Sequence, residues 1–296
     1  MAAVAGTDIP LIVITGPTAS GKSALAIKLA KRWGGEIICA DSRTVYRGMD
    51  IGTAKPTVDD RSKVRHWLLD VVAPGERFSV ADFQRIAREA IADIRARGKV
   101  PFLVGGTGLY IDALILDFQL GGEADMRHRE MLSKLSISQL QMMIKNQHIS
   151  LPENSRNKRY LIRCIEKNNT AQQGKKKPDS HTLVIAIDTD KTLLRQRISE
   201  RAVQMLQQGV VQETQRLLSK YDSDSEAMSG NIYPLIQSYL LGEFSQEELI
   251  QKFIIRDWRL AKRQMTWLRR HDYVEWCSLG LAEKRVDSFL RSYGDA

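Results

Sequence analysis

The fold is decided by the stretch Gly16-Pro17-Thr18-Ala19-Ser20-Gly21-Lys22-Ser23. It fits the phosphate-binding pattern G-x-x-x-x-G-K-[ST], in which glycines let the backbone bend around an anion and the lysine reaches the outer phosphate. An apolar run at residues 11–14 precedes it, and apolar side chains follow at helical spacing over residues 22–33. This order of strand, tight turn and helix predicts a phosphate-binding loop, or P-loop, with Ser23 placed to hold Mg²⁺. A glycine-rich turn that binds nothing is the alternative.

The length and composition of the chain fit one large domain, or one domain with a smaller insertion. Its 296 residues are 43% hydrophobic, which is enough to bury a sizeable core. A formal net charge of +9 weakly favours a polyanionic partner. The cysteines Cys39, Cys164 and Cys277 form no C-x-x-C pair and indicate neither a zinc site nor disulfides. Neither a signal peptide nor a membrane span is evident, so we expect a cytoplasmic monomer.

Strand and helix patterns alternate through the first part of the chain. Glu36 to Ala40 is a buried-strand pattern, and Trp67 to Val72 and Val100 to Val104 are further strand patterns. Ser79-Val-Ala-Asp82 is a capping box that begins a long amphipathic helix. The alternation predicts an α/β fold of the P-loop NTPase-like type, with a doubly wound parallel sheet.

Two polar residues follow predicted strands. Asp41 comes directly after residues 36–40, and Thr107 lies in the glycine-rich turn Gly105-Gly-Thr-Gly-Leu-Tyr110. Because ligands of a parallel sheet collect outside the carboxyl ends of its strands, we expect both residues to lie close to the P-loop. A helix cap or a loop hydrogen bond is the alternative role for each.

The alternation of strand and helix patterns ends at about Gln119. Residues 121–168 show helical periodicity, and the polar, lysine-rich residues 168–180 predict a return loop. The chain rejoins the sheet at residues 181–187, and helical sequence follows to the end, with the longest helix at residues 246–270. We therefore expect a P-loop core at 1–118, a helical insertion domain at 119–180, and core completion with a helical C-terminal region at 181–296.

A P-loop does not by itself name a reaction. Three classes remain open on the residues alone: a small-molecule or nucleotide kinase, a nucleic-acid-dependent NTPase, and an enzyme that uses the loop to hold a diphosphate leaving group. The second class is disfavoured because no clear strand of four apolar residues ends in the aspartate that such enzymes use to hold Mg²⁺.

Four ordered motifs closely resemble the tRNA dimethylallyltransferases of the bacterial type, also called tRNA isopentenyltransferases. The motifs are Gly16–Ser23, Ala40–Ser42 with Val45–Pro56, Val104–Tyr110 and Ala261–Arg269. The resemblance is near-complete over residues 10–118, is patchy in the insertion, and returns at residues 197–213 and 260–269. It implies transfer of a dimethylallyl group from dimethylallyl diphosphate to N6 of the adenosine 3′-adjacent to the anticodon, position 37, in tRNAs reading codons that begin with U.

The resemblance also implies roles for individual residues. The P-loop would hold the diphosphate, with Mg²⁺ near Ser23. Asp41 would act as general base, and Thr107 would hydrogen-bond the bridging oxygen of the diphosphate. The insertion would bind tRNA with the target base extruded from its stack. The positions that match tRNA contacts of the family are Asp41, Ser42, Arg43, Thr44, Arg127, Arg159, Tyr160, Leu161, Ile162 and Arg163.

The chain departs from the family pattern in two places. The pattern M-R-x-[IV]-G-Y-R-Q appears as Met228-Ser-Gly-Asn-Ile-Tyr-Pro-Leu235, which lacks two arginines and a glycine, and T-R-Q appears as Asp257-Trp-Arg259. We expect basic residues of the 246–270 helix to supply the missing anion contacts. A P-loop kinase of a nucleotide or small metabolite and a non-catalytic RNA-binding relative are the alternative functions.

Overall fold

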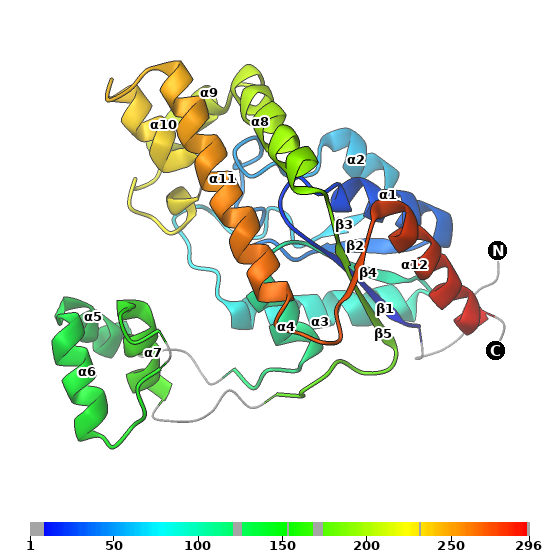
Figure 1. Ribbon diagram of the computed structural model, residues 1–296, viewed down its shortest axis with the longest axis horizontal. Coiled ribbons are helices and arrows are strands. Elements are labelled where there is room, and N and C mark those ends of the chain that lie inside the picture. The colour runs from blue at the N-terminus through cyan, green and yellow to red at the C-terminus, as the bar shows by residue number, and fades with distance from the viewer. Residues whose placement is uncertain (1–8, 121–125, 153, 168–173, 231, 295–296) are drawn as a thin grey trace. The chain divides into compact units, whose positions relative to one another are not determined.

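A parallel β-sheet is at the centre of the protein (Figure 1). The computed structural model describes residues 9–120, 126–152, 154–167, 174–230 and 232–294. Over these residues the sheet has six strands in the order β3-β2-β4-β1-β5-β6, and all neighbouring strands are parallel. The strands are β1 (Leu11–Thr15), β2 (Glu36–Cys39), β3 (His66–Trp67), β4 (Pro101–Val104), β5 (Thr182–Ile187) and β6 (Glu275–Cys277).

Helices cover both faces of this sheet, so the predicted doubly wound α/β fold is confirmed. Alternate strand residues such as Ile12 and Phe102 pack with α1 (Lys22–Trp33) and α12 (Leu279–Gly294) in one core. On the other face, α3 (Val80–Ala96) contacts β2 and β4 and packs against α4 (Gly108–Ile115). The capping box predicted at Ser79 does begin α3.

The chain folds as two compact units. The larger unit comprises Met1–Ile115 and Lys177–Ala296, and the smaller unit comprises Leu116–Lys176. The smaller unit contains α5 (Met126–Lys134), α6 (Ile137–Asn146) and α7 (Lys158–Lys167). Its own hydrophobic core consists of Leu132, Leu140, Ile144, Ile149, Leu161, Ile162 and Ile165. Residues 168–173 of the predicted return loop lie outside the described residues.

The other helices belong to the larger unit. Their bounds are α2 (Val58–Lys63), α8 (Lys191–Gln207), α9 (Val210–Leu218), a 3₁₀ turn (Ala227–Ser229), α10 (Tyr233–Leu240) and α11 (Gln246–Leu268). Among them α11 contacts α4, α8 and α10. None of the helices in the described ranges is both long and apolar enough to cross a membrane.

Two local predictions are wrong. The strand predicted at residues 67–72 stops after Trp67, because Leu68 and Asp70 have φ values of 61° and 58°, which no extended strand allows. Beyond the pairing of β2 with β3, a single isolated parallel bridge joins Tyr46 to Val72. The C-terminal region also contains a strand, β6, which extends the sheet beside β5.

Candidate active site

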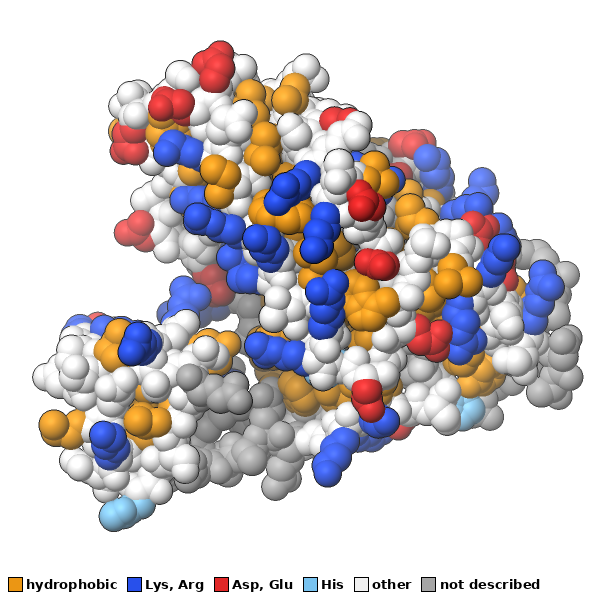
Figure 2. Space-filling model, in the orientation of Figure 1, with side chains coloured by type: hydrophobic (Ala, Val, Ile, Leu, Met, Phe, Trp, Pro, Cys, Tyr) orange, Lys and Arg blue, Asp and Glu red, His pale blue; other side chains and the backbone are white. Residues whose placement is uncertain are grey.

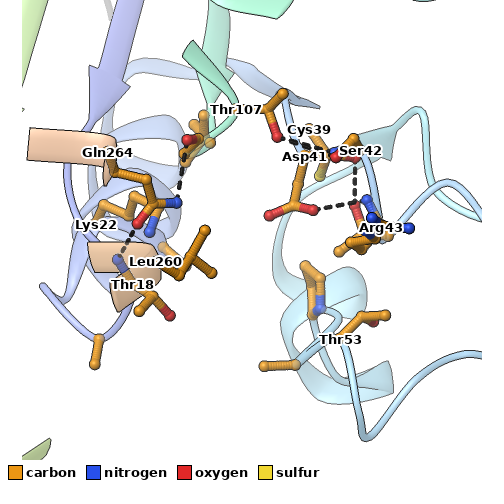
Figure 3. Close-up of a pocket in the computed structure, with 18 of the residues that line it drawn as sticks. Thr18, Lys22, Cys39, Asp41, Ser42, Arg43, Thr53, Thr107, Leu260 and Gln264 are labelled. Carbon is orange, nitrogen blue, oxygen red and sulfur yellow. Dashed lines mark hydrogen bonds between the residues drawn. The ribbon is translucent and has the colours of Figure 1, made fainter. Parts of the chain in front are cut away.

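A cavity of about 550 Å³ opens at the carboxyl ends of the central strands (Figure 3). The P-loop follows β1, Asp41 follows β2, and Thr107 follows β4, and all of them line the cavity together with residues of loop 52–56 and of α11. Figure 3 shows Lys22 and Asp41 on opposite walls. The predicted closeness of Asp41 and Thr107 to the P-loop is therefore confirmed.

The P-loop backbone presents the start of α1 to the cavity. Gly16 and Gly21 have φ values of 140° and 90°, a backbone conformation that residues with a Cβ atom rarely adopt. Gly21 is the N-cap of α1, and no described side chain caps this end of the helix. By contrast, serine side chains cap α3 and α11. The first-turn amides of α1 are thus not used by a side-chain cap, and they can bind an anion.

Lys22 supplies a partly buried positive charge at this end of α1. Its Nζ donates a hydrogen bond to the Pro17 carbonyl oxygen at 3.2 Å, within the curve of the loop. Burial lowers the pKa of Lys22 to about 8, and the nearby Asp41 carboxylate partly offsets this effect. Away from bulk water, the ammonium attracts an anion more strongly than an exposed lysine would.

Two arginines add to this charge. Arg201 of α8 and Arg263 of α11 both line the cavity. Arg201 contacts the Thr18 hydroxyl, and its Nη1 lies 3.7 Å from Oδ2 of Asp257, which is buried. With Lys22, three cations accompany the Asp257 carboxylate on the side of the P-loop and α11. The excess of positive charge suits a polyanionic group such as a diphosphate.

Hydrogen bonds around Asp41 and Thr107 join the ends of β2 and β4. One carboxylate oxygen of Asp41 accepts a hydrogen bond from the Arg43 amide at 2.8 Å. The Thr107 hydroxyl accepts one from the Ser42 amide at 3.0 Å, and the Thr107 amide donates to the Ala40 carbonyl at 3.2 Å. Asp41 thus makes the loop hydrogen bond that the sequence allowed. Figure 3 shows its other carboxylate oxygen directed into the cavity, where it can accept a proton.

Gln264 of α11 bridges the P-loop and the turn that carries Thr107. Its Oε1 accepts a hydrogen bond from the Thr18 amide at 2.8 Å, and its Nε2 donates to the Gly106 carbonyl at 3.1 Å (Figure 3). A Cβ on Gly106 would lie 2.3 Å from this Nε2, so a side chain there would displace the Gln264 amide from the turn. The two phosphate-side loops are therefore held in register by a residue from the C-terminal half of the chain.

The predicted tRNA contacts of the larger unit all lie at the cavity. Ser42, Arg43 and Thr44 line it beside Asp41. The main chain of Ser42 and Arg43 makes the hydrogen bonds that fix Asp41 and Thr107. These residues are therefore part of the candidate site itself.

The other predicted tRNA contacts belong to the smaller unit. Leu161 and Ile162 are buried in its hydrophobic core, so their side chains hold α7 in place, and contact of these two positions with tRNA stays a prediction. Arg159, Tyr160 and Arg163 of the same helix are exposed. Arg127 is exposed on α5. The structure thus reduces the candidate contact surface on α7 to three side chains.

The segment that departs from the family pattern lies beside Arg43. The Arg43 guanidinium donates to the Glu226 carbonyl at 2.6 Å and to the Ser229 hydroxyl at 3.3 Å, and Ser229 occupies a position where the pattern has arginine. The basic residues of α11 do not share one surface. Arg263 lines the cavity, whereas Arg259 lines a separate groove between α8 and α11. Of these two arginines, only Arg263 is placed to contact an anion inside the cavity.

Sequence analysis gave no role to several residues that line the cavity. Gln264 lies inside the motif at residues 261–269, and Arg201 lies in the stretch 197–213 where the family resemblance returns, so the resemblance contained a signal for both. Tyr233 is the aromatic residue that the chain retains from the departed pattern. Its contact with the cavity depends on the packing of α10, which local sequence does not specify.

The cavity residues fit a magnesium ion that is bound together with a phosphorylated ligand. Within the described ranges, no three His, Cys, Asp or Glu side chains lie together where they could hold a metal. Ser23 and Asp41 line the same cavity. Mg²⁺ commonly takes one or two protein ligands and completes its octahedron with phosphate oxygens and water. The donor set is therefore adequate for Mg²⁺ on a diphosphate but not for a metal held by the protein alone.

Fold and cavity together define a P-loop protein of the α/β class whose cavity fits a phosphorylated ligand opposite a carboxylate. Comparison with known proteins narrows this class. A family model described as IPP transferase matches residues 44–271. The chain is also 38% identical over 299 residues to the tRNA dimethylallyltransferase of Geobacillus thermodenitrificans, with 95% of each chain covered.

Solved structures agree with this assignment. The tRNA isopentenylpyrophosphate transferase of Bacillus halodurans matches with a TM-score of 0.74 and 34% identity over 97% of this chain and 98% of that one. A eukaryotic dimethylallyltransferase acting on tRNA matches with a TM-score of 0.75 and 25% identity, over 87% of this chain and 69% of that one. The chain belongs to the IPP transferase family, as its sequence motifs predicted.

Proposed function

We propose that this chain transfers a dimethylallyl group from dimethylallyl diphosphate to N6 of adenosine 37 in tRNAs reading codons that begin with U. The observation that carries the proposal is the pair of opposite cavity walls, with Lys22 on one and Asp41 on the other. A donor held by its diphosphate and an amine held by a carboxylate would meet between these walls. The names of the related enzymes support this choice of donor and acceptor.

One wall of the cavity, which we call the P-loop wall, consists of P-loop residues with Arg201 and Arg263, and it binds the leaving group. The α1 amides and Lys22 bind the diphosphate, and Arg201 and Arg263 add positive charge beside it. As the bond between the dimethylallyl carbon and the diphosphate oxygen breaks, its electron pair passes to that oxygen. The Thr107 hydroxyl then donates a hydrogen bond to the oxygen where charge develops. Mg²⁺ near Ser23 would supply further neutralisation of the diphosphate when bound.

The opposite wall, which we call the Asp41 wall, consists of residues 41–44 and 52–54, and it binds the acceptor. The adenosine N6 amine attacks the dimethylallyl carbon, and the free carboxylate oxygen of Asp41 takes the proton that the amine loses as the new C–N bond forms. The hydrogen bond from the Arg43 amide holds the other oxygen, so the carboxylate has one orientation toward the cavity. Asp41 is in this way the general base, as the resemblance implies.

Two surfaces contact the tRNA in this proposal. The first is the exposed part of α7 in the smaller unit, with Arg159, Tyr160 and Arg163. The second is the groove between α8 and α11, which Arg259 and Lys262 line. Figure 2 shows Lys and Arg side chains gathered over the face of the molecule where α8 and α11 run. We also propose where and in what form the enzyme acts. Because tRNA modification takes place where tRNA is made and used, we place the enzyme in the cytoplasm. We propose that it acts there as a monomer.

The test is a direct comparison of donors. Purified protein is incubated with dimethylallyl diphosphate labelled in its alkyl group and unmodified tRNA, and in parallel with γ-labelled ATP and nucleotide or metabolite acceptors. We expect label in the tRNA, and digestion should yield N6-(dimethylallyl)adenosine from position 37. Label transferred from ATP to a small acceptor would indicate a kinase instead. Binding of tRNA with no transfer from either donor would indicate a non-catalytic RNA-binding protein.

A further inference from the structure

Glu213 of α9 holds one loop of the cavity through four hydrogen bonds. The side chain is buried, and its Oε2 accepts hydrogen bonds from the amides of Asp50 and Ile51 at 2.9 and 2.8 Å. Its Oε1 accepts one from the Gly52 amide and one from the Tyr233 hydroxyl, both at 2.9 Å. A carboxylate in a ring of donors is a strongly directional contact, so the turn at residues 50–52 has one position relative to α9.

Tyr233 completes this arrangement from α10. A Cβ on Gly52 would lie 2.6 Å from the Tyr233 ring and hydroxyl oxygen, so the loop rests directly on the phenol. Burial, together with the charge of Glu213, raises the pKa of Tyr233. The phenol therefore stays neutral and remains a hydrogen-bond donor to Glu213. Three elements that are distant in sequence are thus locked together.

The loop that Glu213 holds forms part of the cavity wall. Gly52, Thr53, Ala54 and Tyr233 line the cavity, and Figure 3 shows Thr53 on the same side as Asp41. Glu213 is not itself among the lining residues and acts through this loop. Two of its four hydrogen bonds come from the lining residues Gly52 and Tyr233, and the other two come from Asp50 and Ile51, which directly precede Gly52. The P-loop wall is instead held by contacts from α8 and α11.

We infer that Glu213 is a positioning residue for the acceptor nucleotide. The inference rests on the proposed function, in which the acceptor lies on the Asp41 side and the donor diphosphate on the P-loop side. By fixing residues 50–54, Glu213 sets the width of the space in which the adenosine approaches the dimethylallyl carbon. Its loss disturbs tRNA use and the chemical step, and leaves donor binding intact.

Glu213→Gln tests this with little change of volume. The variant keeps one oxygen and turns an amide NH₂ either toward the amides of Asp50 and Ile51 or toward the Gly52 amide and the Tyr233 hydroxyl. Because a hydroxyl can also accept, at least one main-chain hydrogen bond to the loop is lost in either orientation. We expect the KM for tRNA to rise about tenfold or more and the single-turnover rate to fall by a similar factor, the scale of losing hydrogen bonds to a charged group. The Kd for dimethylallyl diphosphate should stay within about twofold of the wild-type value, because its P-loop contacts are untouched.

Thr214→Val is the matched control. Thr214 is the next residue of α9, is buried, and donates its hydroxyl only to the Val210 carbonyl, at 2.8 Å, among the hydrogen bonds described for its side chain. This substitution destabilises the same helix without touching the loop. Below the Tm of both variants, its KM for tRNA and its transfer rate should stay within about twofold of wild type.

If Glu213→Gln does not fold, Gly52→Ala allows the same measurements of tRNA KM, single-turnover rate and donor Kd. The added methyl group meets Tyr233 and displaces the wall while Glu213 is unchanged. The same loss of tRNA use with intact donor binding supports the inference. Unchanged tRNA kinetics in a folded Glu213→Gln or in Gly52→Ala overturns it, as does an equal loss of donor affinity. Absence of transfer by the wild-type protein would instead refute the proposed function, and this inference with it.

Discussion

The side chain of Gln264 accepts a hydrogen bond from the main-chain amide of Thr18 at 2.8 Å, which ties α11 to the P-loop. The same side chain donates to the carbonyl oxygen of Gly106 at 3.1 Å. The P-loop is therefore not a self-contained phosphate site. Its position relative to the turn that carries Thr107 depends on a helix almost at the end of the chain.

Gln264→Met should weaken both donor binding and transfer. The substitution conserves length but leaves the Thr18 amide and the Gly106 carbonyl without this partner, at a cost of about 1–3 kcal/mol for each group. We expect the Kd for dimethylallyl diphosphate to rise and single-turnover transfer to fall, each by about tenfold. Gln251→Met, at an exposed position of the same helix, is the control and should change neither value. Wild-type donor affinity in Gln264→Met would show that the bridge does not support the phosphate site.

Donor binding should depend on pH through Lys22. Burial lowers its pKa to about 8, so the ammonium predominates below pH 8 and is lost as the pH rises through that value. The affinity for dimethylallyl diphosphate should be nearly constant up to about pH 7, should be about halved near pH 8, and should then fall by up to about tenfold per pH unit. Titration calorimetry without tRNA measures this profile. In Lys22→Arg the charge persists, so the decline above pH 8 should disappear. The same decline in both proteins would assign it to another group.

The smaller unit should serve tRNA and not the donor. Its two ends meet, because the Lys175 amide donates to the Leu116 carbonyl at 2.6 Å, so a short Gly-Ser linker can replace residues 119–173. The unit has its own core, and its removal leaves the sheet and the P-loop intact. We expect near-normal binding of dimethylallyl diphosphate and no measurable tRNA binding. In the full chain, Arg159→Ala with Arg163→Ala should weaken tRNA binding in the same direction. A folded deletion variant with normal tRNA affinity would contradict this assignment.

The groove between α8 and α11 should contribute salt-dependent tRNA contacts. Arg259 and Lys262 line it, and Lys262 lies 5.6 Å from the centre of the Trp258 ring. Replacing both cations with Gln should weaken tRNA binding and reduce the log-log salt slope by about two units if each contacts a phosphate. Lys284→Gln with Arg291→Gln, which changes two exposed cations of α12, controls for net charge. Equal effects of the two pairs would mean that the groove makes no specific contact.

The sequence allowed prediction of the parts of the site that depend on local order along the chain. Asp41 and Thr107 could be placed near the P-loop because each follows a strand, and the carboxyl ends of parallel strands meet at one edge. Gln264 and Arg201 reach the cavity from helices of the C-terminal half, and Glu213 of the same half holds a loop of its wall. Their positions depend on how those helices pack on the sheet. The family motifs contained a signal for Gln264 and Arg201, but no periodicity or turn pattern places these side chains at the site.

The differences between expectation and structure have equally specific causes. Leu161 and Ile162 matched contact positions of the family, but helical periodicity places their side chains in the core of the smaller unit, whereas those of Arg159 and Arg163 are exposed. The three residues of β6 are too few for a period of two to be visible. Its pairing with β5 is a tertiary contact of the sheet edge.

The most direct test of the central claim compares Asp41→Asn with Lys22→Ala in two separate measurements, donor binding and single-turnover transfer to tRNA at saturating substrates. We predict that Asp41→Asn binds dimethylallyl diphosphate normally and transfers its alkyl group about two to four orders of magnitude more slowly, the usual scale for loss of a general base. Lys22→Ala should lose about ten- to a hundredfold in donor affinity, the scale of a charge-assisted contact. Near-normal transfer by Asp41→Asn would contradict the claim that the two walls divide donor binding and proton removal between them.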